Sequence, residues 1–120
     1  MKTGHKELFV WQKSMDFAVF VYKLIKKLPD CEKFGLISQM QRAVSSIAAN
    51  IAEGYARKSQ KDFMRFLYIA LGSSAELETF LELAYRLEYI SNQELDESNQ
   101  FNDEIRRMLK SLIKSIAERQ

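Results

Sequence analysis

Apolar side chains recur every three or four residues along nearly the whole chain, and only one proline interrupts them. This spacing gathers apolar groups on one face of an α-helix, whereas strand-like alternation is absent over any useful length. Pro29 should end the first periodic segment, because proline lacks the backbone N–H that continues a helix. The pattern predicts an all-α fold with helices over residues 8–28, 36–57, 60–88 and 93–118.

The loops between these segments are short, so successive helices should run in opposite directions. The chain has 120 residues and is 47 % hydrophobic, which is enough for one core. We therefore expect a single domain over residues 1–120, an up-down-up-down antiparallel four-helix bundle. Ser59 with Asp62, and Ser91 with Glu94, have the spacing of capping boxes that start helices. Gly54 inside the second helix suggests close approach of another backbone, since glycine there costs about 1 kcal/mol relative to alanine.

The first helix carries two apolar stripes on nearly opposite sides. A surface helix of a small monomer needs only one such stripe, so the second predicts contact with another copy of the chain. The sequence does not show which of the two stripes faces outward. We choose the second stripe as the interface. The first, the Trp11 stripe, contains Leu8, Trp11, Met15, Val19 and Tyr22. The second, the Phe17 stripe, contains Val10, Phe17, Val21, Leu24 and Leu28, and we assign Val10, Phe17, Val21 and Leu24 to the oligomer interface.

A chain with one cysteine and one histidine has no disulfide framework and lacks the ligands of most metal sites. A ferritin-like di-metal bundle would need paired Glu-x-x-His motifs, for which a second histidine is missing. We expect no metal and no cofactor. No run approaches the roughly 20 apolar residues that span a bilayer, and the first residues lack a signal-peptide pattern. We expect a cytoplasmic protein with no membrane partner.

Polar side chains of the second and third helices could form either a structural network or a reactive site. Glu53 and Glu76 are the carboxylates concerned, and Arg42 is the obvious partner for one of them. Because a buried charge needs a partner, we favour a satisfied structural network over a catalytic or metal-binding role. We assign no catalytic residue and expect a protein that is not an enzyme. The network is assigned to Arg42, Ser46, Asn50, Glu53, Ser73 and Glu76.

Basic side chains gather in two places, although the formal net charge is only +2. Such clusters can be ordinary solvated surface, but repeated in an oligomer they would add up to phosphate binding that depends on salt. No recognition-helix motif indicates base-specific reading, so we expect contacts to the nucleic-acid backbone. The turn cluster comprises Arg57, Lys58, Lys61 and Arg65, and the C-terminal cluster comprises Arg107, Lys110 and Lys114.

Several separated motifs resemble the 23S rRNA-intervening sequence protein family, also called the four helix bundle protein family. They are QMQRAVSSIAANIAEG at residues 39–54, LFVWQK at 8–13, FGL at 34–36 and FLYIALGSSAELET at 66–79. The resemblance implies a helical bundle that forms homopentameric rings. It also implies a distant similarity to the accessory variability determinant of diversity-generating retroelements, which binds nucleic acid and a reverse transcriptase. No catalytic role comes with it.

Two functions are consistent with these observations. The first is a homo-oligomer, implied by the resemblance to be a pentamer, that binds structured RNA or DNA through repeated basic clusters. The alternative is a protein–protein adaptor without nucleic-acid affinity, whose ring presents helices to a protein partner. Salt-dependent binding would distinguish the first from the second.

Overall fold

Four α-helices account for most of residues 4–119, the part of the chain described by this computed structural model. These residues contain no β-strand. Short 3₁₀ turns precede α1, follow it and precede α2. The helices are α1 (Phe9–Leu24), α2 (Leu36–Tyr55), α3 (Gln60–Arg86) and α4 (Asn92–Glu118), and the 3₁₀ turns are η1 (Gly4–Glu7), η2 (Ile25–Lys27) and η3 (Asp30–Glu32).

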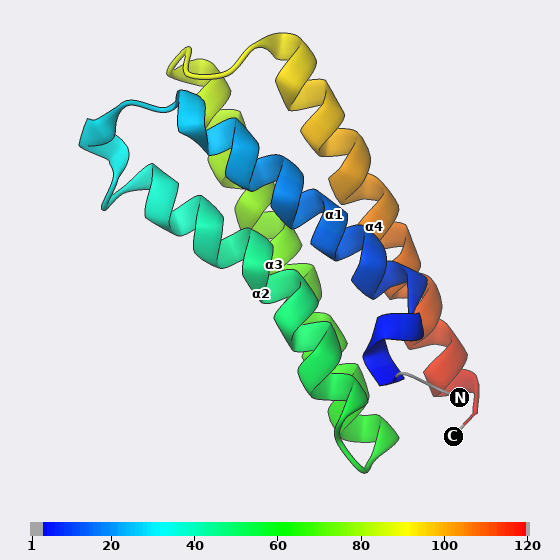
Figure 1. Cartoon of the computed structure of the whole chain (residues 1–120). Helices are drawn as coiled ribbons and strands as arrows, with labels where there is room; N and C mark the ends of the chain where they lie inside the picture. The colour runs from blue at the N-terminus through cyan, green and yellow to red at the C-terminus, as the bar shows by residue number, and fades with distance from the viewer. Residues whose placement is uncertain (1–3, 120) are drawn as a thin grey trace.

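Each helix packs against two others. α1 and α3 both contact α2 and α4, so α1 and α3 lie diagonally across the bundle. Successive helices run in opposite directions, and the molecule is an elongated body of 46 × 24 × 22 Å (Figure 1). The α2–α3 turn lies at the same end as both chain termini, whereas the α1–α2 and α3–α4 loops lie at the other end (Figure 1).

Both predicted capping signals start helices. The Ser59 hydroxyl accepts a hydrogen bond from the Asp62 backbone N–H at 3.1 Å, which caps α3. At α4 the box is complete, because the Ser91 hydroxyl accepts from the Glu94 N–H at 3.1 Å and the Glu94 carboxylate accepts from the Ser91 N–H at 2.8 Å. These bonds satisfy N–H groups that the first turn of a helix would leave without partners.

The predicted helices are longer than the observed ones, mainly at their C-terminal ends. α1 ends at Leu24 rather than at residue 28, and the chain tightens into η2 before Leu28 becomes extended ahead of Pro29. A residue before proline avoids the helical region for steric reasons, which explains this early end. α2 ends at Tyr55 and α3 at Arg86, each two residues before the predicted boundary.

The structure corrects the assignment of the oligomer interface on α1. Val10, Phe17, Val21 and Leu24 are all buried in the core of the chain itself. They are therefore not a free face, and the prediction that they form an interface between copies is wrong. Instead the Trp11 stripe faces outward, where Met15, Val19 and Tyr22 are exposed.

The buried face of α1 is one continuous seam. Val10, Ser14, Phe17, Val21 and Leu24 alternate steps of four and three, which keeps one straight seam facing a neighbouring helix. Ser14 continues this seam because its hydroxyl donates to its own helix, at the Val10 carbonyl oxygen 2.7 Å away. The Phe17 ring completes the contact with α4 by stacking on Phe101, with ring centroids 5.1 Å apart.

Gly54 lies at a close approach of α2 and α3. A Cβ atom there would lie 2.7 Å from the Phe66 Cβ and 3.2 Å from the Phe63 carbonyl oxygen, closer than side chains tolerate. The expected close backbone approach is confirmed. Gly72 of α3 differs, because a Cβ there would meet nothing within 4 Å among the described residues.

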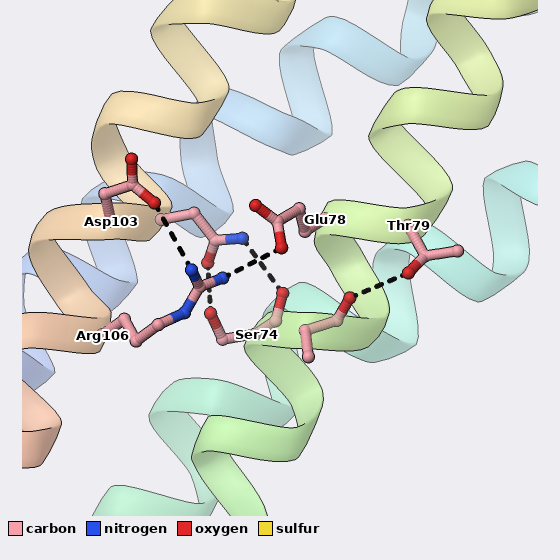
Figure 2. A network of polar contacts seen from close by, with 7 residues as sticks. Ser74, Glu78, Thr79, Asp103 and Arg106 are labelled. Atoms are coloured by element: carbon pink, nitrogen blue, oxygen red, sulfur yellow. Dashed lines mark hydrogen bonds and ion pairs between the residues drawn. The ribbon is translucent and has the colours of Figure 1, made fainter.

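A polar contact inside the bundle joins α3 to α4. The buried Ser74 hydroxyl donates to the Asn102 side-chain oxygen at 2.5 Å, and the Asn102 amide donates to the Ser74 carbonyl oxygen at 3.0 Å. Beside this pair, Arg106 reaches Glu78 at 3.2 Å and Asp103 at 3.4 Å (Figure 2). Paired polar groups in a core favour one register of the two helices over others.

Candidate nucleic-acid interface

The turn cluster lies at the end of the bundle where α2 reverses into α3. Arg57 and Arg65 both lie over one aromatic ring, with their guanidinium carbons 4.8 and 4.5 Å from the centroid of Phe66. This arrangement fixes two long side chains against an apolar surface. Stacked guanidinium groups keep N–H donors at their edges, which suit the oxygens of a phosphate.

The charges of the turn cluster are only partly neutralised. Arg57 pairs with Glu53 at 2.9 Å, and Arg65 lies 3.8 Å from an Asp62 carboxylate oxygen. Lys58 and Lys61 are exposed and have no ion-pair partner within residues 4–119. Exposed pairs are weak and readily exchanged for water or another anion. The cluster can therefore offer four cations to a polyanion.

A cavity of about 610 Å³, the end cavity, adjoins the turn cluster. It brings Arg57 and Lys58 together with Arg119, which follows α4, and with the aromatic rings of Tyr55 and Phe63. Arg119 was missed by the sequence analysis. Its place follows only from topology, since an up-down-up-down bundle returns the C-terminal end of its fourth helix to the α2–α3 turn.

The C-terminal cluster is a separate surface. Arg107, Lys110 and Lys114 are exposed on α4 and have no ion-pair partner among the described residues. Arg107 borders a largely apolar groove of about 490 Å³, between α4 and the start of α1, where Phe9 is exposed. Arg107 is not part of the end cavity, so the turn cluster is continued by Arg119 instead.

The predicted polar network is correct for three of its six members. The Ser46 and Ser73 hydroxyls lie 2.8 Å apart, and the Asn50 amide donates to both the carbonyl oxygen and the hydroxyl of Ser46 at 2.8 Å. These three residues link α2 to α3.

The assignment of the other three residues to this network is wrong. The side chains of Arg42, Glu53 and Glu76 are all exposed. Glu53 pairs with Arg57 on its own helix rather than with Arg42. Arg42 and Glu76 have no ion-pair partner within residues 4–119. Exposed charges are solvated by water and need no partner, so the burial that motivated the network does not apply to them.

Other classes of site receive no support from residues 4–119. No group of three or more His, Cys, Asp or Glu side chains there is arranged to hold a metal ion. Nor is any helix in that range long and apolar enough to cross a bilayer. Cys31 is a free thiol on the exposed turn η3. The basic end of the bundle thus remains the candidate site.

Comparison with known proteins agrees with this fold. A family model described as 23S rRNA-intervening sequence protein matches residues 6–111. The structure is similar to the crystal structure of a protein of unknown function from the S23 ribosomal protein family of Bacteroides thetaiotaomicron VPI-5482. The TM-score is 0.78 at 38 % sequence identity, over 88 % of this chain and 98 % of that one. A search of curated proteins gave no match.

Proposed function

This chain belongs to the 23S rRNA-intervening sequence protein family, and from that premise we propose that it is a non-enzymatic homo-oligomer that binds structured RNA or DNA. The contacts would be made to backbone phosphates rather than to base edges. The observation that carries the proposal is the turn cluster, in which Lys58 and Lys61 have no ion-pair partner among the described residues. A cytoplasmic location is part of the proposal, and the free Cys31 thiol suits a reducing compartment.

Oligomerisation would repeat the turn cluster around one assembly. Two exposed apolar surfaces support it: the Trp11 stripe on α1, and the outward face of α3 with Ile69 and Leu83, continued by Leu87 directly after the helix. Because α1 and α3 lie diagonally, the α1 surface of one copy can pack on the α3 surface of the next. Such a head-to-tail contact closes into a ring when the rotation between copies permits. The number five rests on the family resemblance alone.

A protein adaptor is the second candidate function. Its support is Phe34, which is 89 % exposed next to the 3₁₀ turn η3, at the end of the bundle opposite the turn cluster. An aromatic ring exposed to this degree is an anchor typical of protein interfaces. This candidate predicts co-purification with a protein partner and no affinity for RNA at physiological salt.

A charge-reversal experiment tests the proposed function. Lys58, Lys61 and Arg65 are changed together to Glu, and binding of a structured RNA and a duplex DNA is titrated at several salt concentrations. Losing phosphate contacts should make the slope of log affinity against log salt shallower by about one for each contact. Helical content by circular dichroism should not change, because all three side chains are exposed.

The matched control reverses Lys23, Lys26 and Lys33, three exposed lysines nearer the other end of the bundle. It changes the net charge equally and should retain binding. An equal loss in both triple variants would mean that overall charge, not the turn cluster, determines the affinity. Absence of binding by the unaltered protein at low salt would favour the adaptor.

A further inference from the structure

The end cavity has the size and lining of a site for one nucleotide. Its volume of about 610 Å³ falls within the range of roughly 300–1,000 Å³ typical of small-molecule sites. Four parts of the chain line it: the start of the chain around Glu7, the end of α2, the start of α3 and the end of α4. Segments far apart in sequence thus converge on one space.

Three cations line this space, and they outnumber the acidic groups. They are Arg57, Lys58 and Arg119, and Glu7 is the one carboxylate among the lining residues that the structure describes. Arg119 is held in place by its own helix, donating from Nη2 to the Ser115 hydroxyl at 2.9 Å and from Nε to the Ser115 carbonyl oxygen at 3.3 Å. Its remaining N–H groups are available to a ligand. A terminal phosphate, with a charge close to −2, matches this excess of positive charge in the end cavity.

The start of α3 adds a second attraction for an anion. Ser59 and Gln60 line the end cavity at the N-terminus of a 27-residue helix. The first N–H groups of a helix have no partner within it, and the helix dipole favours negative charge there. The Ser59 hydroxyl occupies only the Asp62 N–H, at 3.1 Å. Arginine, lysine and a helix start together make a phosphate site.

The remaining lining is aromatic and aliphatic, which an inorganic anion would not need. Tyr55 and Phe63 meet edge to face with ring centroids 5.8 Å apart. Leu8, Leu112 and Ile116 complete the apolar part. A nucleobase stacks on such rings without regard to sequence. Cations beside aromatic rings therefore match a nucleotide, with its phosphate on the cations and its base on the rings.

We infer that the end cavity binds the phosphorylated terminal nucleotide of a nucleic-acid strand. An internal nucleotide of a duplex could not present its base, because pairing and stacking hold it inside the helix. A single-stranded, phosphorylated end presents both an unpaired base and a phosphate monoester, whose charge exceeds that of an internal diester. The inference deepens the proposed function and rests on it. The turn cluster binds backbone phosphates, and the end cavity binds the terminal nucleotide of the strand.

The test compares three single-stranded RNA oligonucleotides of one sequence, with a 5′-phosphate, a 3′-phosphate or hydroxyl groups at both ends. We expect one phosphorylated form to bind about tenfold more tightly than the hydroxyl form, as the loss of a charged hydrogen bond would predict. A nucleoside 5′-monophosphate alone should shift the ring signals of Tyr55 and Phe63 in NMR spectra. The variants Arg119→Gln and Lys58→Gln should abolish the preference. The control Arg42→Gln removes an exposed arginine of α2 that lies outside both basic clusters and the end cavity, and it should keep the preference.

The outcomes separate this inference from the proposed function. Equal binding of all three oligonucleotides without ring shifts would overturn the inference, even where binding remains sensitive to reversal of Lys61 and Arg65. A preference that Arg119→Gln leaves unchanged would also overturn it. A monophosphate that binds while no oligonucleotide does would overturn both the inference and the proposed function, and would make the end cavity a site for a free nucleotide.

Discussion

Glu88 is the one non-glycine residue in the described part of the chain with a left-handed backbone, at φ 65°. It ends α3 in a Schellman motif. Its N–H donates to the Tyr85 carbonyl oxygen and the Tyr89 N–H donates to the Ala84 carbonyl oxygen, each at 2.9 Å. This position usually holds glycine, because a Cβ atom crowds the backbone in that conformation.

Replacing Glu88 with glycine should therefore stabilise the protein. The expected gain in the free energy of unfolding is about 0.5–1 kcal/mol, measured by urea denaturation. The control is Glu88→Ala, which removes the same carboxylate but keeps the Cβ atom. If alanine stabilised the protein as much as glycine, the effect would come from the carboxylate and not from the backbone.

At the residue scale, local roles could be predicted from the sequence and distant ones could not. Ser59 and Ser91 act on groups three residues away, so spacing alone reveals them. Ser46 and Ser73 meet across two helices, and they could be predicted only as members of a polar network between the second and third helices. The exposure of Arg42 could not be derived, because it depends on where the neighbouring helices cover α2.

At the element scale, Glu94 joins the start of α4 to the end of the first helical segment. Its carboxylate accepts from the Lys27 ammonium group and from the Ser91 N–H. These contacts, the Lys27 hydrogen bond first, lower the pKa of Glu94 below its ordinary value. The carboxylate is thus more easily ionised in the folded chain than in the unfolded one, so its contribution to stability is present above the unfolded pKa.

Protonating or replacing this carboxylate should weaken the fold. The stabilisation should be lost as the pH falls through the folded pKa, below the unfolded value of about 4.3. Glu94→Gln should cost about 0.5–1 kcal/mol in urea denaturation at neutral pH, and the difference from the unaltered protein should shrink in acid. The control is Asp96→Asn, at an exposed residue of α4 with no ion-pair or hydrogen-bond partner among the described residues, which should leave the free energy of unfolding unchanged at neutral pH. A difference for Glu94→Gln that persisted unchanged in acid would contradict this assignment.

The apolar periodicity predicts where the helices lie, but it does not predict which face of α1 is buried. The starts of α3 and α4 were predictable because their caps are local, whereas the inward face of α1 was not. Both of its stripes are apolar, and the sequence does not state which one the neighbouring helices cover. The deciding contacts, such as Phe17 on Phe101, lie more than 80 residues apart in the chain.

At the scale of the whole molecule, the end cavity combines predicted and unpredicted residues. Arg57 and Lys58 are consecutive and were identified from charge alone. Arg119 joins them only because the bundle closes with its C-terminal end beside the α2–α3 turn. A cluster contiguous in sequence is visible before folding, but a cavity is a property of the packed helices.

The two faces of α1 provide the sharpest test of the assembly. Val19 is 52 % exposed on the Trp11 stripe, whereas Val21 is fully buried two residues further on. A charge at position 21 would be buried without a partner, so Val21→Glu should unfold the chain, with a loss of about 3 kcal/mol or more. Val19→Glu should leave the helical content unchanged and disrupt only a contact between copies.

Light-scattering mass and circular dichroism together distinguish these results. The unaltered protein should have the mass of several chains, and Val19→Glu should have that of one. Ile69→Glu, on the opposite helix α3, should act in the same way, because a head-to-tail contact needs both surfaces. Lys23→Glu reverses a charge at an exposed polar position of α1 and serves as the control. Dissociation by Val19→Glu but not by Ile69→Glu would instead indicate a two-fold contact of α1 with itself, which pairs copies without forming a ring.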